Sequence, residues 1–297
     1  MSAWRSVFIT KPCRLSMKNK QLVYEPRDEQ TIRVSLEDIS VIVLENNISN
    51  VTTALLSEIS EKNIVLFSCD NYHMPNGCFM PFHQHSRLSQ IAHMQVKMKV
   101  PLKKRLWQKI ITQKISNQSQ LLKHFGIKNL QLELLKDKVL SGDSQNLEAQ
   151  AARKYWALLF KDFRRDQKAF DPINIALNYG YAIVRGAVAR SLVAFGLLPT
   201  FGVFHHSELN AYNLADDMIE PFRPMVDKVV KSLALEDKLD VCLPTSVKSE
   251  LINVLNMEMI LDKENVTILN VCDLMAQTFV KSIKQNDMAC LKLPSLK

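Results

Sequence analysis

The stretch PINIALNYGYAIVRGAVARSLVAFGLL, residues 172–198, is apolar over most of its length; it begins with Pro172 and is followed by Pro199. Pro172 suits the first turn of a helix, where its missing N–H costs nothing, whereas Pro199 cannot continue a helix. The pattern therefore predicts one long apolar helix over residues 172–198.

Apolar residues recur with helical spacing through the whole chain after residue 83. Pro101 is expected to separate two long polar and basic helices at the start of this part. The sequence thus predicts an all-helical second domain, residues 83–297. Besides residues 172–198, helices are expected over residues 86–100, 102–124, 130–140 and 146–160, near residue 213, from residue 244 and over residues 266–284.

Short runs of β-branched residues, separated by turn formers, dominate the chain before residue 83. The runs SVFIT (6–10), QLVY (21–24), TIRV (31–34) and ISVIVL (39–44) predict strands, and residues 51–62 predict one short amphipathic helix. We therefore expect residues 1–82 to form a β-rich, β-sandwich-like domain that serves folding and assembly. The fold class of the whole chain is α+β.

The length of 297 residues exceeds what one hydrophobic core usually serves and favours two domains. Glycine is scarce, with seven residues in the chain, and no phosphate-binding or dinucleotide fingerprint is found. No apolar run approaches the roughly 18 residues of a membrane span, and the N-terminus lacks the apolar stretch of a signal peptide. These absences predict a cytoplasmic protein without a membrane partner.

Positive charge is concentrated in the middle of the chain. Residues 83–168 contain 18 Lys and Arg against 6 Asp and Glu, whereas residues 1–82 contain 8 against 9 and residues 169–297 contain 12 against 15. A basic segment beside a carboxylate-bearing segment favours a polyanionic partner such as nucleic acid. The alternative is a solvated helical face, which is what charge runs usually are.

Two regions carry ionisable groups among apolar helix formers. Asp216 and Asp217 stand four and three residues before Glu220, so helical spacing would place carboxylates on one face, where a divalent cation would relieve their repulsion. Glu148 lies among alanines, with a favourable charge at a helix N-terminus as its alternative role. His205 and His206 are adjacent and point different ways, so at most one of them is expected to serve a single site, with a structural role as the alternative. One imidazole with the carboxylates gives a ligand mix that suits manganese and tolerates magnesium.

Four motifs give this chain a resemblance to a known family. NLEAQAARKYW (146–156), DPINIALNYGY (171–181), GVFH (202–205) and LADDMIEPFRPMVD (214–227) resemble, in this order, motifs of CRISPR-associated protein 1, the spacer-acquisition integrase and endonuclease. The match runs from about Trp4 to Val230. The run from the doubled Asp to the second Pro looks like the branch that accompanies a single RNA-guided effector nuclease, the type II systems.

The resemblance implies a metal-dependent active site. Glu148, His205 and Glu220 match the catalytic and metal-binding residues of the family, and Asp217 matches a frequent helper as a further candidate ligand. His205 is preferred to His206 because it stands three residues after the family's glycine, here Gly202. The implied cofactor is Mg²⁺ or Mn²⁺. The implied reaction joins the 3′-hydroxyl ends of a short duplex, the prespacer, into the CRISPR repeat array by transesterification.

The resemblance also implies partners. The expected assembly contains double-stranded DNA, a homodimer formed through the β domain, and the small CRISPR-associated protein 2 in a heterohexamer-like complex, with the effector nuclease as a further candidate partner. Basic residues are expected to hold DNA phosphates without much sequence preference. The candidate DNA-binding residues are Lys103, Lys104, Arg105, Arg164, Arg165 and Arg223.

Two other functions are compatible with the same residues. A metal-dependent nuclease that cuts branched DNA without integration would use the same site, since cleavage is the reverse of joining. A non-catalytic nucleic-acid-binding scaffold would explain the basic segment equally well, with the carboxylates as helix caps and ion-pair partners. The scaffold explains poorly why three acids stand so close together before Pro221.

Overall fold

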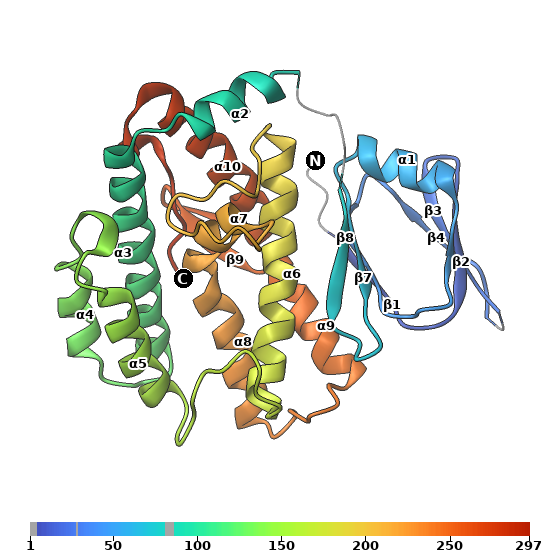
Figure 1. Cartoon of the computed structure of the whole chain (residues 1–297). Helices are drawn as coiled ribbons and strands as arrows, with labels where there is room; N and C mark the ends of the chain where they lie inside the picture. The colour runs from blue at the N-terminus through green and yellow to red at the C-terminus, as the bar shows by residue number, and fades with distance from the viewer. Residues whose placement is uncertain (1–4, 28, 81–85) are drawn as a thin grey trace. The chain divides into compact units, whose positions relative to one another are not determined.

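Strands gather in the first part of the chain and helices in the rest, as the α+β prediction requires (Figure 1). This computed structural model describes residues 5–27, 29–80 and 86–297. The chain divides into two units, Met1–Ser86 and Arg87–Lys297. The expected boundary between residues 82 and 83 lies outside the described residues.

The first unit consists of short strands and one helix. Its helix, α1 (Thr53–Glu61), begins after Thr52, whose hydroxyl accepts a hydrogen bond from the N–H of Leu55. Thr52 is therefore a side-chain N-cap. The strands are β1 (Arg5–Ile9), β2 (Cys13–Lys18), β3 (Gln21–Pro26), β4 (Ile32–Ser35), β5 (Ile39–Leu44), β6 (Asn50–Val51), β7 (Val65–Cys69) and β8 (Pro75–Phe79).

Two four-stranded sheets share the core of the first unit. One has the order β1-β5-β7-β8, with β1, β5 and β7 parallel, and the other has the order β4-β3-β2-β6. Strand β5 is buried along its whole length because it is a central parallel strand, which explains its unbroken apolar run. Leu15 from one sheet, Ile42 from the other and Leu55 from α1 lie in one apolar cluster. The sandwich-like prediction is confirmed.

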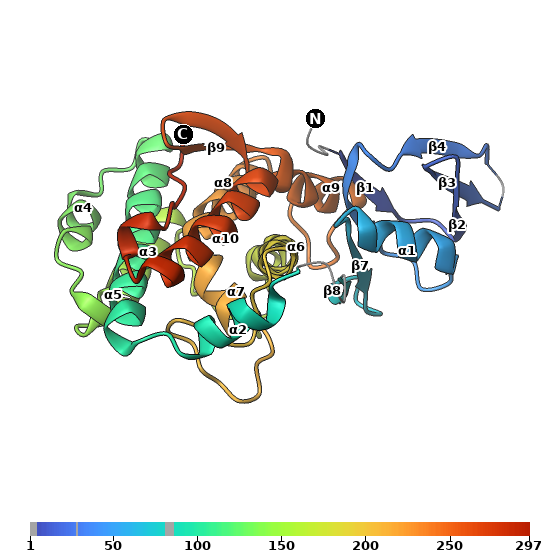
Figure 2. The same cartoon turned by 90° about the horizontal axis from the view of Figure 1, so that it is seen from above.

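The second unit is mostly helical, and α6 (Pro172–Ala194) runs through it (Figures 1 and 2). Helix α6 packs against α8 (Arg223–Leu235) and α10 (Ile268–Gln285), which lie between it and α3 (Val100–His124). The other elements are α2 (Leu88–Val96), α4 (Leu130–Lys136), η1 (Ser141–Asp143), α5 (Leu147–Leu159), α7 (Asn213–Met218), η2 (Glu220–Phe222), α9 (Thr245–Asn253), η3 (Val254–Asn256), β9 (Glu258–Leu261), β10 (Glu264–Thr267) and η4 (Met288–Cys290).

Helix α6 ends four residues earlier than the expected Leu198. Gly196 adopts a positive φ of 76°, and the N–H of Leu197 donates back to the carbonyl of Leu192, which closes the helix in a Schellman motif. At Gly180 a β-carbon would lie 2.5 Å from Cγ1 of Val226, so the glycine allows α6 and α8 to approach closely. No helix in the described part of the chain is both long and apolar enough to span a bilayer.

The second unit also contains a β-hairpin, so it is mostly helical rather than all-helical. Strands β9 and β10 pair antiparallel, and Asp262 and Lys263 form the connecting turn with φ angles of 52° and 73°. A turn with two positive φ angles usually contains Asn-Gly or Asp-Gly, which makes it recognisable in the sequence. Lys263 in place of glycine explains why the sequence analysis assigned Val266 to a helix instead.

A buried carboxylate ties three helices of this unit together. Asp227 of α8 accepts a hydrogen bond from the Tyr155 hydroxyl of α5 at 2.6 Å and another from the Tyr181 hydroxyl of α6. Burial raises the pKa of Asp227 to about 6, although both hydroxyl groups stabilise the carboxylate.

This raised pKa makes a prediction about stability. Between pH 4 and pH 6 the native protein binds more protons at Asp227 than the unfolded chain does, so this group stabilises the fold most at low pH. Its contribution should decline by about 3 kcal/mol as the pH rises through 6. We expect the free energy of unfolding of the wild type, measured relative to Asp227→Asn in urea, to fall over this range. A difference that does not vary with pH would contradict the assignment.

Candidate active site

The ammonium group of Lys114 lies between two carboxylates from separate segments. Its Nζ atom is 2.6 Å from Oε1 of Glu148 and 2.5 Å from Oε2 of Glu220. Lys114 comes from the middle of α3, Glu148 from the first turn of α5 and Glu220 from η2. The fold therefore brings together two of the acids that the sequence analysis selected, which are 72 residues apart.

Helix α5 is positioned by a carboxylate that the sequence analysis did not select. Asp143 of η1 accepts hydrogen bonds from the N–H groups of Leu147 at 2.8 Å and Glu148 at 3.0 Å. Asn146, the residue before α5, adopts a left-handed conformation and accepts a longer bond of 3.4 Å from the N–H of Ala149. Asp143 thus fixes the first turn of α5 and, with it, the position of Glu148.

Glu220 is held by a second cation besides Lys114. Nε of Arg223 lies 2.8 Å from Oε1 of Glu220, and its guanidinium lies over the ring of Tyr181. Burial would raise the pKa of Glu220, but the charges of Arg223 and Lys114 outweigh burial and lower the pKa. Each oxygen of Glu220 therefore has its own cation, Arg223 at Oε1 and Lys114 at Oε2.

Asp217 shapes the loop that carries His205. Its Oδ2 accepts hydrogen bonds from the N–H groups of Val203 and Phe204, and its Oδ1 accepts one from the N–H of His205. Nδ1 of His205 lies 2.7 Å from the same Oδ1, and because a carboxylate only accepts, Nδ1 carries the proton. At Gly202 a β-carbon would lie 2.8 Å from Oδ2 of Asp217, so this position needs glycine.

Asp217 thus leaves Nε2 as the nitrogen with which His205 can bind a ligand. The hydrogen bond to Asp217 raises the pKa of His205. Both oxygens of Asp217 are engaged by the loop, and its side chain is fully buried. This arrangement favours a role for Asp217 in orienting His205 rather than in binding a metal directly.

Aromatic rings also hold this loop. Phe204 stacks on Trp107 of α3 with 4.3 Å between ring centroids, and the His205 ring meets Trp107 edge-on at 5.7 Å. His206 is exposed, and its Nδ1 lies 2.9 Å from the carbonyl oxygen of Phe204. The two adjacent histidines therefore point to different surroundings, as expected for neighbouring loop residues.

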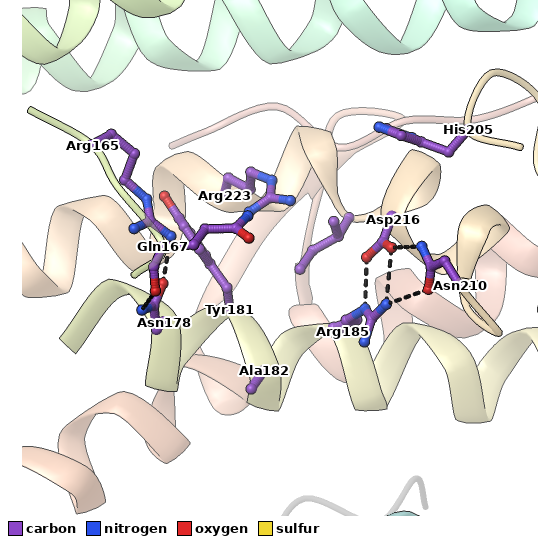
Figure 3. Close-up of a pocket in the computed structure, with 11 residues that line it drawn as sticks. Arg165, Gln167, Asn178, Tyr181, Ala182, Arg185, His205, Asn210, Asp216 and Arg223 are labelled. Atoms are coloured by element: carbon purple, nitrogen blue, oxygen red, sulfur yellow. Dashed lines mark hydrogen bonds and ion pairs between the residues drawn. The ribbon is translucent and has the colours of Figure 1, made fainter. Parts of the chain in front are cut away.

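The three acids near Pro221 do not share one face. Asp216 forms a two-point ion pair with Arg185 of α6 and accepts a hydrogen bond from Asn210, as Figure 3 shows. Asp217 faces the histidine loop and Glu220 faces Lys114. The expected face is lost because α7 ends at Met218 and the chain continues in the tighter η2. Each carboxylate consequently has its own partners.

Two polar pockets adjoin at this place. One, of about 300 Å³, is lined by the acid pair and Lys114, and the other, of about 510 Å³, contains His205. Figure 3 shows the His205 ring directed from its loop toward Arg223. The two pockets share Arg165, Gln167, Tyr181 and Arg223 in their walls.

The donor groups fit a divalent metal ion. Glu148 and Glu220 already hold a cation between them, and carboxylate oxygen is a ligand that Mg²⁺ and Mn²⁺ prefer. Within residues 5–27, 29–80 and 86–297, no three His, Cys, Asp or Glu side chains are grouped closely enough to hold a metal ion as they stand. His205 lines the neighbouring pocket, so the convergence of all three residues on one ion stays a prediction.

The predicted DNA-binding residues fall into two groups. Lys104, Arg105 and Arg164 are exposed, and Lys103 is partly exposed. Residues 103–105 precede Lys114 by about three turns of α3, roughly 15 Å along its axis. They are thus available to a polyanion at some distance from the acid pair.

The other two candidates are built into the pocket walls. Arg165 donates hydrogen bonds to the side-chain oxygens of Asn174 and Asn178 at 2.7 and 2.6 Å, and Arg223 pairs with Glu220. Both guanidinium groups lie within 5.4 Å of the Tyr181 ring centroid. They can face a phosphate in the pocket, but their position also depends on these structural contacts.

Sequence reasoning missed Lys114, although the sequence carries a signal for it. Trp107, Ile111, Lys114 and Gln118 follow one another at helical spacing and all face away from solvent in α3. A lysine on a buried helical face needs a compensating acid. Arg185 gave a similar signal inside the apolar α6, where it meets Asp216.

Comparisons with known proteins identify the family. The family model of CRISPR associated protein Cas1 matches residues 7–241. A protein of Neisseria meningitidis serogroup C (strain 8013), named CRISPR-associated endonuclease Cas1, is 39% identical over 297 residues, which cover 99% of this chain and 96% of that protein.

Solved structures share the fold at lower identity. A casposase bound to integration product superposes with a TM-score of 0.78 at 18% identity, covering 96% of this chain and 93% of that one. A Cas6-RT-Cas1–Cas2 complex contains a chain with a TM-score of 0.76 at 18% identity, covering 99% of this chain and 36% of that one. From the family model and the near full-length relative, this chain belongs to the CRISPR-associated protein Cas1 family.

Proposed function

We propose that this chain is a metal-dependent DNA endonuclease and integrase of CRISPR adaptation, which joins the 3′-hydroxyl ends of a short duplex into the repeat array. The observation that carries the proposal is the meeting of Glu148 and Glu220 on one cation beside the pocket of His205. The Neisseria relative is named an endonuclease, and the casposase of similar fold is bound to an integration product, so both support the same reaction class.

Glu148, Glu220 and His205 would hold Mg²⁺ or Mn²⁺, the first two through carboxylate oxygens and the third through Nε2. When bound, the ion supplies a Lewis acid that polarises the scissile phosphodiester and stabilises charge on phosphorus. Asp217 would keep the proton of His205 on Nδ1 and so direct Nε2 to the site.

The cationic pocket walls would position the phosphate groups. Arg223 is anchored by Glu220 and by the Tyr181 ring, and Arg165 by Asn174 and Asn178. Side chains fixed in this way can hold a phosphodiester at little cost in conformational entropy. In-line attack by a DNA 3′-hydroxyl expels another 3′-hydroxyl, so the number of phosphodiester bonds is conserved and no nucleoside triphosphate is consumed.

The direct test incubates the protein and its small Cas2 partner with Mg²⁺ or Mn²⁺, a short duplex and a supercoiled plasmid that carries a repeat. Covalent joining of the duplex to the plasmid is the expected result. Nicking without joining would favour the branched-DNA nuclease, and the absence of both would favour the non-catalytic scaffold.

Replacing each of the two adjacent histidines in turn tests which one belongs to the site. His205→Ala should reduce metal-dependent joining by at least about a hundredfold, the size of effect typical of a placed catalytic group. His206→Ala, the matched control, should retain most of the activity because His206 is exposed and contacts only a loop carbonyl in the described residues. The reverse result would show that the loop has been assigned one residue out of register.

DNA binding should survive loss of the acid pair. Glu220→Gln should bind duplex DNA about as well as the wild type but join no ends, because the affinity is expected to come from the basic segment, residues 83–168, through counterion release. Affinity measured by fluorescence anisotropy should fall roughly ten- to a thousandfold between 50 and 200 mM salt.

Neutralising the exposed cations tests whether they supply the DNA affinity. Changing Lys103, Lys104, Arg105 and Arg164 together to Gln should weaken binding and flatten its salt dependence. The matched control changes both lysines to Arg and keeps the charge, so its salt dependence should stay that of the wild type. Equal salt dependence in all three proteins would disprove the role of this surface.

The assembly is proposed to contain a homodimer made through residues 1–82 and a Cas2 dimer, with the RNA-guided effector nuclease as a further candidate. The balanced charge of the first unit allows two copies to meet without strong repulsion. Strand β4 lies at the edge of its sheet and exposes 53% of Ile32, so an edge is available for a partner. The similarity to a chain of the Cas6-RT-Cas1–Cas2 complex supports the second partner.

Single charges on exposed apolar residues test the dimer. Ile32→Asp should lower the dimer fraction measured by light scattering after gel filtration, because a charge would be buried in the contact. Leu134→Asp in α4, where Leu134 is also 53% exposed, is the matched control and should leave the dimer intact. Dissociation by Leu134→Asp alone would place the contact in residues 83–297.

A further inference from the structure

Lys114 is the most deeply placed cation of the candidate active site. Its side chain is 10% exposed, and that of Glu220 is 5% exposed. Nζ of Lys114 lies 2.6 Å from Oε1 of Glu148 and 2.5 Å from Oε2 of Glu220. The ammonium is therefore held by the two carboxylates between which it lies.

The charges of this cluster balance without a metal ion. Glu148 and Glu220 contribute two negative charges, and Lys114 and Arg223 contribute two positive charges within 2.8 Å of them. A divalent ion added to this group would leave an excess of two positive charges in a largely buried place, which is strongly unfavourable. Displacement of one of the two cations would reduce that excess to one positive charge.

Lys114 is the cation that can give way. Arg223 occupies the other oxygen of Glu220 and is fixed by the Tyr181 ring, so it can remain in place. Lys114 contacts both carboxylates at once, so its Nζ occupies the place between them that a bridging divalent ion would take. The lysine charge is carried on a flexible four-carbon stem with rotatable donors, whereas the Arg223 guanidinium is a planar group stacked on an aromatic ring.

We propose that Lys114 is the resident counter-ion of the metal site: its ammonium neutralises Glu148 and Glu220 until a divalent ion displaces it from between them. The inference rests on the proposed metal-binding role of the two glutamates. Lys114 thereby keeps the two acids together in the metal-free protein and sets the concentration of metal ion that the protein needs. It is a positioning residue that acts through the glutamates.

The test compares wild type and Lys114→Met, which keeps the length of the side chain but not its charge. Mn²⁺ binding is measured from the electron paramagnetic resonance signal of the free ion, and the thermal midpoint is measured in EDTA and in saturating Mn²⁺. The variant should bind Mn²⁺ roughly 5- to 150-fold more tightly, the range typical of coupled binding events. Its midpoint should be lower than that of the wild type in EDTA and should recover in Mn²⁺.

Lys109→Met is the matched control from the same helix. Nζ of Lys109 donates to the carbonyl oxygens of Met288 at 3.2 Å and Leu291 at 2.5 Å and contacts no carboxylate of the site. This variant should lose the same thermal stability with and without Mn²⁺ and should bind Mn²⁺ like the wild type. If Lys114→Met lowers the thermal midpoint equally in EDTA and in Mn²⁺, Lys114 has only a structural role.

Further variants separate failure of this inference from failure of the proposed function. If Lys114→Met does not fold, Lys114→Gln removes the charge while it keeps a hydrogen-bond donor, and it should also tighten Mn²⁺ binding. Unchanged or weaker binding in the folded variant, with normal binding by the wild type, would overturn the inference alone. If the wild type and the Glu148→Gln, Glu220→Gln double variant bind Mn²⁺ equally, the metal site itself is disproved, and the inference with it.

Discussion

The candidate active site depends on holding two carboxylates next to each other in a largely buried place. Glu148 and Glu220 would repel one another there, and their proximity is tolerable because Lys114 and Arg223 supply equal and opposite charge. Three segments must meet for this balance, namely the middle of α3, the capped start of α5 and η2. The position of each segment is therefore tied to an ion pair, and the loss of one partner would leave a buried charge without compensation.

Around this cluster a framework of buried polar contacts fixes the elements that carry it. Asp227 joins α8 to α5 and α6 through two tyrosines, and Asp217 organises the histidine loop through four hydrogen bonds. Both carboxylates are inaccessible to solvent. Buried polar networks whose members are all satisfied define one arrangement of their elements, and a site built from three segments requires such an arrangement.

The sequence predicted the strand-rich first unit and the helical second unit because hydrophobic periodicity and proline positions are local signals. It missed the end of α6 at Ala194, although Gly196 marked it, and the β9–β10 hairpin, whose turn uses Lys263 where a glycine is typical. Family motifs selected Glu148 and Glu220, which the fold brings together. The sequence signals that Lys114 and Arg185 each need an acid, but it does not say which one. Lys114 meets Glu148 and Glu220 only in the tertiary structure, and the same holds for the pair of Arg185 and Asp216.

The electrostatics of the site and of the basic segment have different consequences for a DNA substrate. The exposed cations of residues 83–168 attract a polyanion from a distance. The two acids and two cations of the cluster that contains Glu220 cancel one another in charge and act only at contact. In the proposed reaction, two uncompensated carboxylates would repel a phosphodiester from the site. Neutrality of the cluster would allow phosphate to approach the glutamates before a divalent ion is in place. Helix α3 carries Lys114, which balances the acids, and also the exposed cations of residues 103–105.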